Sequence, residues 1–279
     1  MLHCGKFALS LEKPLIMGIV NITHDSFSGD GLSSNIENAI LHAHHQIEQG
    51  ADIIDLGAES SRPGALPIHA AEEIDRLLPI LDALKDSGVP ISVDTGKPKV
   101  MQAVLLHGAS MINDINALRA PKALEIAAKS DCAVCLMHMQ GTPLTMQQNP
   151  GYSNVVSEVR DFFVERLASM KAAGIDLKRL ILDPGFGFGK TLHHNLELIR
   201  HLGDISVNGL PVLAGLSRKS MLGEITGRTV TERLAASITA AVLAVQRGAK
   251  ILRVHDVAQT RDALAVMHKV LEKSNANRS

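Results

Sequence analysis

The sequence lacks the features that mark several special classes of protein. It has no tryptophan, one tyrosine and three cysteines, which are too few for a disulfide framework. No apolar run approaches the roughly 20 residues that span a membrane, and residues 1–10 lack a signal-peptide pattern. The formal net charge of -1 gives no electrostatic basis for binding nucleic acid or an acidic membrane. We therefore expect a cytoplasmic protein that binds neither.

Two of the cysteines, Cys132 and Cys135, have the spacing of half a redox or zinc motif. They lie in an apolar run that is typical of a β-strand, where residues three apart point to opposite faces. We expect buried, unreactive thiols there instead, because free cysteine is common in protein cores.

Short apolar runs rich in β-branched residues alternate along the chain with amphipathic helical patterns. The expected strands cover residues 15–20, 53–57, 90–94, 110–114, 132–138, 179–183, 211–216 and 250–255. The expected helices cover residues 35–49, 70–86, 98–107, 121–129, 153–173, 193–202, 231–247 and 258–273. Eight such units in about 250 residues favour a (β/α)8 TIM barrel over an open doubly wound sheet.

The chain is expected to form one domain over residues 1–279, because no linker rich in proline, glycine or serine divides it. Its 279 residues, 46% of them hydrophobic, are enough to bury a large core. Residues 1–13 precede the first expected barrel strand. We expect this N-terminal extension to form a short hairpin that closes the bottom of the barrel.

A polar group follows each expected strand. These groups are Asn21, residues 59–62, Asp94, Thr95, Asn113, Asp114, His138, Gln140, Asp183, residues 217–219 and residues 253–255. A solvent-facing loop explains any one of them, but it explains poorly why every strand ends in a group with directional hydrogen bonding. Because the carboxyl ends of barrel strands meet at one face, we expect a single pocket there.

The types of these residues indicate what the pocket binds. Asp94, Asn113 and Asp183 suit a neutral heterocycle with adjacent N–H donors, since a carboxylate can accept two parallel hydrogen bonds. Basic side chains follow the last two strands, where this barrel usually binds phosphate. These groups are Arg218, Lys219, Arg253 and His255, and they indicate a phosphate or diphosphate. Asn21 supplies a neutral oxygen that, together with diphosphate oxygens, could hold Mg2+.

Residues 183–190, Asp-Pro-Gly-Phe-Gly-Phe-Gly-Lys, form a glycine loop directly after a strand. The loop is not a P-loop, because Pro184 stands where the first glycine is needed, and its glycines do not have the dinucleotide spacing. The chemistry is therefore expected to be neither ATP-driven nor hydride transfer. Phe186 and Phe188 are either core residues or contacts to an aromatic ligand, and the scarcity of aromatic residues favours the second interpretation.

These motifs together resemble the bacterial dihydropteroate synthase family over essentially the full chain. The matching segments are Met17-Gly-Ile-Val-Asn-Ile-Thr23, Asp25-Ser-Phe-Ser28, Gly50-Ala-Asp-Ile-Ile-Asp-Leu-Gly57, Glu59-Ser-Ser-Arg-Pro-Gly64, Ser92-Val-Asp-Thr95, Ile112-Asn-Asp-Ile115, Met137-His-Met-Gln-Gly141, the glycine loop, Ser217-Arg-Lys-Ser220 and Arg253-Val-His-Asp256. The resemblance implies a dimeric (β/α)8 enzyme of folate synthesis. Such an enzyme condenses 6-hydroxymethyl-7,8-dihydropterin diphosphate with 4-aminobenzoate, and sulfonamides compete with the second substrate.

The resemblance also implies roles for individual residues. The pterin would be bound by Asp94, Asn113, Met137, Asp183 and Lys219. The diphosphate would be bound by Asn21, Arg253 and His255, with Asn21 also holding Mg2+. The 4-aminobenzoate would be surrounded by Ser61, Arg62, Pro63, Phe188, Ser217 and Lys219, and Asp25 and Phe27 would belong to a closing loop. Catalysis would depend on Asp94, Lys219, Arg253 and His255.

The sequence departs from the family pattern in the first two loops. His24 replaces a common proline, the usual order of Asp and Gly is exchanged at Gly29 and Asp30, and Ser61 replaces a common threonine. The first two changes leave open a non-catalytic pterin-binding paralogue. A pterin-dependent methyltransferase, which shares the barrel and a similar pterin pocket, is the alternative among enzymes.

Overall fold

The computed structural model describes residues 1–22, 32–59 and 66–272, and its centre is a closed barrel of eight parallel strands. The strands are β3 (Leu15–Asn21), β4 (Ile53–Gly57), β5 (Ile91–Asp94), β6 (Met111–Asp114), β7 (Ala133–Met137), β8 (Leu180–Asp183), β9 (Val212–Ala214) and β10 (Ala249–Val254). Strand β10 pairs with both β9 and β3, which closes the barrel. The expected (β/α)8 fold is confirmed, and the open doubly wound sheet is excluded.

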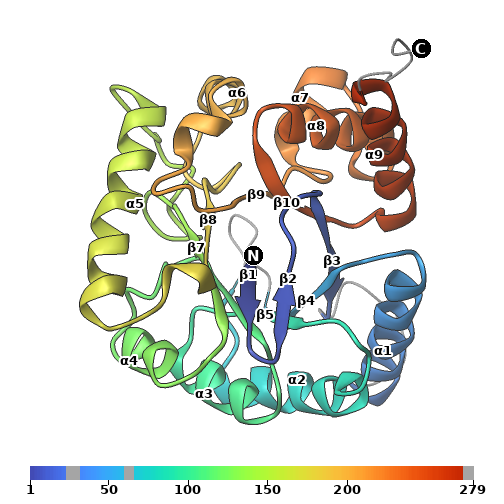
Figure 1. Ribbon diagram of the computed structural model, residues 1–279, viewed down its shortest axis with the longest axis vertical. Helices are drawn as coiled ribbons and strands as arrows, with labels where there is room; N and C mark the ends of the chain where they lie inside the picture. Colours follow the sequence, from blue (N-terminus) through green and yellow to red (C-terminus); the bar gives the residue numbers. More distant parts are fainter. Residues whose placement is uncertain (23–31, 60–65, 273–279) are drawn as a thin grey trace, which may run out of the picture.

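The helices form a ring outside the strands (Figure 1). They are α1 (Leu32–Glu48), α2 (Ala70–Leu84), α3 (Pro98–Leu106), α4 (Ala123–Ala128), α5 (Val155–Ala172), α6 (Leu192–Arg200), α7 (Ser220–Thr226), α8 (Leu234–Gln246) and α9 (Val257–Leu271). Most expected bounds differ from these by only a few residues. Helix α7 was not expected, because a seven-residue helix is too short to give a periodic pattern.

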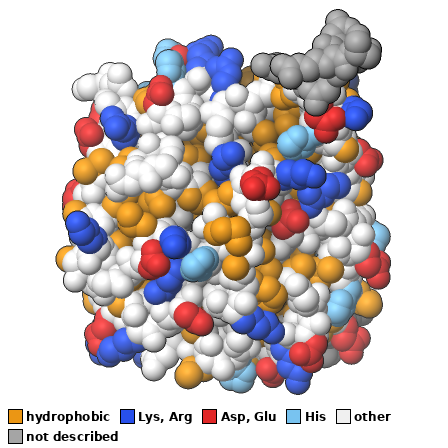
Figure 2. All heavy atoms as spheres, in the orientation of Figure 1, with side chains coloured by type: hydrophobic (Ala, Val, Ile, Leu, Met, Phe, Trp, Pro, Cys, Tyr) orange, Lys and Arg blue, Asp and Glu red, His pale blue; other side chains and the backbone are white. Residues whose placement is uncertain are grey.

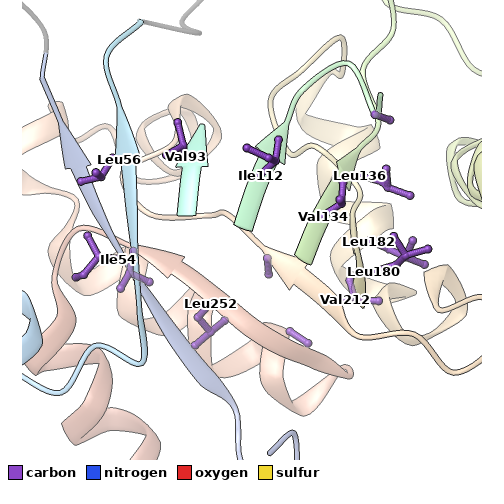
Figure 3. Close-up of a cluster of buried hydrophobic side chains, with 14 of the residues drawn as sticks. Ile54, Leu56, Val93, Ile112, Val134, Leu136, Leu180, Leu182, Val212 and Leu252 are labelled. Carbon is purple, nitrogen blue, oxygen red and sulfur yellow. The ribbon is translucent and has the colours of Figure 1, made fainter. Parts of the chain in front are cut away.

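Each barrel strand divides its side chains between two cores, because successive residues point to opposite faces. The outward residues, among them Ile54, Val93 and Leu182, belong to the core between strands and helices (Figure 3). The inward residues of the lower barrel, among them Met17 and Ile181, form a second core inside the barrel. The inward side chains of the strands are therefore apolar at the bottom of the barrel, and the residues at the carboxyl ends lie above this inner core.

The N-terminal extension closes the bottom of the barrel, as expected. Strands β1 (Leu2–Cys4) and β2 (Phe7–Leu9) pair antiparallel in a hairpin that lies across the middle of the barrel in Figure 1. Leu2 and Cys4 are buried in the inner core with Ile53 and Met111, at the start of the strands. Figure 2 shows charged side chains of both signs interspersed on the face that it presents.

All three cysteines are free and buried. Cys132 belongs to the outer core and Cys135 to the inner core, so the two thiols do lie on opposite faces. Burial is the main cause that raises the pKa of Cys4 to about 12, which keeps this thiol protonated. Over the described ranges of the chain, no helix is both long enough and apolar enough to cross a membrane.

We predict that the hairpin contributes to global stability. Leu2→Ala removes a side chain that is only 1% exposed and should lower the free energy of unfolding by about 2–5 kcal/mol in urea titrations. Leu106→Ala is the matched control, because Leu106 ends α3 with 80% of its surface exposed and should give a change near zero. Equal effects of the two substitutions would show that the hairpin does not pack into the barrel.

Candidate active site

Most of the predicted strand-end residues lie on the inward face at the carboxyl ends of the strands, but Asp114 and His138 point outward. Asn21 ends β3, Asp94 ends β5 and Asp183 ends β8. Strand pairing places Asp94 opposite Asn113 and Met137 opposite Asp183. The barrel therefore brings these residues to one rim, as the sequence predicted.

A hydrogen-bond network centred on Arg253 and Asp55 joins four strands at this rim. Arg253 on β10 donates from Nε to Asp55 Oδ2 on β4 at 2.6 Å and from Nη2 to Asp94 Oδ2 on β5 at 2.9 Å. The same Asp55 oxygen accepts from Asn113 Nδ2 on β6 at 3.1 Å. One connected network thus fixes the side chains of Arg253, Asp94 and Asn113 relative to one another.

Burial and neighbouring charges shift the pKa values of the ionisable groups at this rim. It raises the pKa of Asp94 to about 7, against the opposing effect of the Arg253 guanidinium. Burial also acts to lower the pKa of Arg253, but the nearby Asp55 and Asp94 outweigh it and the pKa rises, so the arginine stays charged. Burial raises the pKa of Asp183, and it lowers the pKa of Lys219 to about 8. The charge of Asp183 is the main effect that raises the pKa of Lys219, and it therefore favours the protonated amine at neutral pH.

An apolar wall stands beside these charges. Phe188 packs in a cluster with Met137, Met139 and Met146, and Ile115 lies against it. The Lys219 ammonium is 4.4 Å from the centre of the Phe188 ring, which is the geometry of a cation–π contact. A flat aromatic molecule could lie against such a wall, since thioether side chains adapt to its shape.

The third part of the rim contains Ser217, His255 and Asn21. Ser217 Oγ lies 2.9 Å from His255 Nδ1 and accepts from the His255 backbone N–H at 3.3 Å. Gly57 lies between Asn21 and Asp94, because a Cβ atom at this glycine would be 3.4 Å from Asn21 Oδ1 and 3.8 Å from Asp94 Cβ. The rim therefore offers neutral oxygens near its anionic groups.

The structure corrects two sequence interpretations. Phe186 is 1% exposed and belongs to the outer core, so the interpretation as a ligand contact is wrong for this residue. Arg218, which we grouped with the anion-binding cations, instead forms a two-point ion pair with Asp256, from Nη2 to Oδ1 at 2.6 Å and from Nε to Oδ2 at 3.2 Å.

The glycines of the loop over residues 184–190 are explained by close backbone contact. Gly185 and Gly189 have φ values of +68° and +62°. A Cβ atom at Gly185 would stand 2.0 Å from the His138 carbonyl oxygen, and one at Gly189 would stand 2.6 Å from that of Gln140. The motif thus lets the chain after β8 lie directly on the chain after β7, where a side chain would not fit.

Sequence reasoning missed Asp55, which is buried at the centre of the network. Its signal was available, because it is the single carboxylate in the strand Ile-Ile-Asp-Leu-Gly and shares the inward parity of Gly57. Five predicted site residues lie outside the described residues. They are Asp25, Phe27, Ser61, Arg62 and Pro63, and the departures at His24, Gly29 and Asp30 also lie there.

Comparisons with known proteins agree with this geometry. Residues 17–255 match the family described as pterin binding enzyme. Dihydropteroate synthase of Escherichia coli strain K12 is 46% identical over 272 residues, which are 97% of this chain and 96% of the relative.

Two solved structures are similarly close. Xanthomonas albilineans dihydropteroate synthase with 4-aminobenzoic acid has 48% identity and a TM-score of 0.90, covering 95% of this chain and 96% of that one. Burkholderia cenocepacia dihydropteroate synthase complexed with 7,8-dihydropteroate has 45% identity and a TM-score of 0.89, covering 96% of this chain and 95% of that one.

We predict that Arg253→Met destabilises the fold most at high pH. The substitution leaves Asp55 and Asp94 without their buried counter-charge, which should cost about 3–5 kcal/mol at pH 8. Losing the guanidinium also raises the pKa of Asp94 further, so protonation below that pKa should reduce the deficit relative to wild type by pH 6. Urea unfolding across this pH range measures the effect.

The double variant Arg253→Met with Asp55→Asn is the control for this prediction. It removes the charge on each side of the closest ion pair and should be less destabilised than the sum of the two single variants. An additive result, or a deficit that does not change with pH, would mean that the network carries no coupled charge.

Proposed function

The chain belongs to the dihydropteroate synthase family of pterin-binding enzymes. It is a transferase that condenses 6-hydroxymethyl-7,8-dihydropterin diphosphate with 4-aminobenzoate. We propose which residues of the rim bind each substrate and the leaving group. The products are 7,8-dihydropteroate and diphosphate. The observation that carries the division of roles is the network in which Arg253 is bonded to Asp55 and Asp94 beside Asn113.

We assign the pterin to the side of the rim formed by Asp94, Asn113 and Asp183, with Met137 against its face. Asp183 is almost fully buried, and its Oδ1 accepts from the Gly185 backbone N–H at 2.8 Å, which fixes the direction of the carboxylate. A fixed, buried carboxylate can accept paired N–H groups of a pterin ring. Lys219 stands near Asp183 and can donate to a ring oxygen or nitrogen.

We assign the diphosphate to Arg253, His255 and Asn21. The guanidinium has five N–H groups, and its bonds to Asp55 and Asp94 leave others to bind an anion. Because two carboxylates already hold the arginine, it needs no reorganisation when the leaving group develops charge.

The Asn21 side chain fits a magnesium role. Over the described ranges, no three His, Cys, Asp or Glu residues are placed to hold a metal ion by themselves. Mg2+ keeps several waters and takes phosphate oxygens with few protein ligands, so one neutral oxygen from Asn21, close to Asp94, suits it. A bound Mg2+ would supply further neutralisation of the diphosphate charge.

We assign the 4-aminobenzoate to the side of Phe188, Ser217 and Lys219, with Ser61, Arg62 and Pro63 from the sequence resemblance. The aniline nitrogen is already a nucleophile, so the site needs no strong base. Electron donation from the dihydropterin ring stabilises the methylene cation as diphosphate leaves. The protein must then exclude water until the amine attacks, and we assign this to the chain around Asp25, Phe27 and Arg62.

We also propose that the chain forms a homodimer through α8 and α9. These neighbouring helices lie together in Figure 1 and carry apolar side chains that are exposed in the single chain. They are Leu234, Leu243, Val266, Val270 and Leu271. An apolar surface over two packed helices is a common basis for association.

The first experiment measures diphosphate release from the pterin diphosphate with Mg2+, with and without 4-aminobenzoate, while following dihydropteroate. Product that depends on 4-aminobenzoate is expected. Pterin binding without product would instead support a non-catalytic paralogue, and methyl transfer would support a methyltransferase. The set formed by Lys219, Arg253 and His255 favours the diphosphate reaction.

We predict that Asp183→Asn weakens pterin binding about 100-fold, because a charge-assisted pair of hydrogen bonds is lost while the bond from Gly185 can remain. Calorimetry with 6-hydroxymethylpterin measures the change. The companion variant Arg62→Ala should weaken mainly 4-aminobenzoate binding. Near-normal pterin affinity in Asp183→Asn would reject the pocket assignment.

We predict that Leu243→Lys converts the dimer to a monomer, because it places a charge in the proposed apolar interface. Sedimentation equilibrium measures the mass. Leu106→Lys, on the exposed end of α3, is the control and should remain dimeric. A wild-type chain that sediments as a monomer would reject the homodimer.

A further inference from the structure

Three successive carbonyl groups of the glycine loop each accept a hydrogen bond from a side chain. Gln147 Nε2 donates to the Gly187 carbonyl at 2.6 Å, and the Tyr152 hydroxyl donates to the Gly189 carbonyl at 2.9 Å. Between them, Lys190 Nζ donates to the Phe188 carbonyl at 2.9 Å. The loop around Phe188 is therefore held at three consecutive points.

Lys190 is unusual among these donors, because it is a lysine that is only 3% exposed. Its other partners are His138 Nδ1 at 3.0 Å and the His138 carbonyl at 3.4 Å. Within the described part of the chain, no carboxylate forms an ion pair with it. Burial of a cation without such a pair is costly, so stability alone does not explain this lysine.

The His138 ring is suited to receive the lysine. Burial, together with the nearby Lys190, lowers the pKa of His138 to about 3, so the ring is neutral and Nδ1 can accept. The ring packs edge-on against Phe162 of α5, with centroids 4.9 Å apart. His138 directly follows β7, so Lys190 ties the glycine loop to a rigid strand end.

We propose that Lys190 is a positioning residue for 4-aminobenzoate. By joining the Phe188 carbonyl to His138, it holds the Phe188 ring against the methionine cluster and below the Lys219 ammonium, where the ring forms one wall of the pocket. The inference rests on the role proposed above for Phe188. Lys190 itself donates to protein groups and is not assigned a contact with either substrate.

Lys190 donates hydrogen bonds to Phe188 and His138, whereas the pterin residues Asp183 and Lys219 act on it through their charges. Asp183 favours the protonated form of Lys190 and Lys219 opposes it. Burial, the largest effect, lowers the pKa of Lys190 to about 7. The pterin contacts at Asp94 and Asn113 belong to the separate network around Asp55. Loss of Lys190 should therefore weaken the binding of 4-aminobenzoate more than that of the pterin diphosphate.

The test is Lys190→Met in the full chain, since methionine keeps an unbranched side chain as far as Cε and removes the Nζ donor. The KM for 4-aminobenzoate should rise about 10-fold or more. The KM for the pterin diphosphate should change less than about 3-fold. The thermal unfolding midpoint should fall only modestly, because relief of the buried ammonium offsets the acceptors left unpaired at His138 and Phe188. Lys178→Met, at an exposed lysine, is the matched control and should change none of these.

Phe188→Ala separates the proposed role of Phe188 from the proposed role of Lys190. If it raises the KM for 4-aminobenzoate and Lys190→Met does not, the role of Lys190 is rejected while that of Phe188 stands. If Phe188→Ala leaves that KM unchanged, the proposed role of Phe188 is rejected, and the inference about Lys190 with it. An equal change in both KM values in Lys190→Met would indicate general damage and would also overturn the inference.

A second variant keeps the test valid if Lys190→Met folds poorly. Tyr152→Phe removes the neighbouring donor to the Gly189 carbonyl without changing a charge. It should raise the KM for 4-aminobenzoate by about 3-fold and leave the pterin KM unchanged. No change in either KM would show that the hold on this loop does not position the substrate wall.

Discussion

The site depends on the pairing of one arginine with two buried carboxylates. Arg253 comes from the last strand of the barrel, whereas Asp55 and Asp94 come from the second and third, so the network exists only when β10 has closed onto β3. Three charges at this depth would be costly if any one were missing. Together they hold Arg253 and Asn113 in place, which is the preorganisation that a site for a charged leaving group requires.

The sequence was sufficient to predict the architecture. Eight apolar runs were the eight strands, and Leu2 and Cys4 do close the barrel from below. The rim residues were also predictable, because the carboxyl ends of parallel strands converge wherever the chain forms a barrel. Asn113, Asp183 and Arg253 needed no structural information to be selected.

Other features could not be predicted from local patterns, since they depend on which side chains meet across the barrel. Phe186 and Phe188 are two residues apart and equally apolar, yet one is in the outer core and the other lines the rim. Arg218 and Lys219 are adjacent cations, but only the structure shows that Asp256 engages Arg218. Asp55 is the single carboxylate of an apolar strand, but its partners on β6 and β10 appear only from the structure.

The hairpin at the bottom of the barrel also bears on the order in which the molecule can fold. Leu2 and Ile251 share the inner core, although almost the whole chain separates them. Contacts of such long sequence separation are slow to form, because the loop between them must first lose its entropy. A chain still missing β10 would leave both the hairpin and the lower strands with exposed apolar surface. Sealing the bottom of the barrel is therefore expected to be a late folding event, and nascent or shortened chains are expected to be the forms most prone to aggregate.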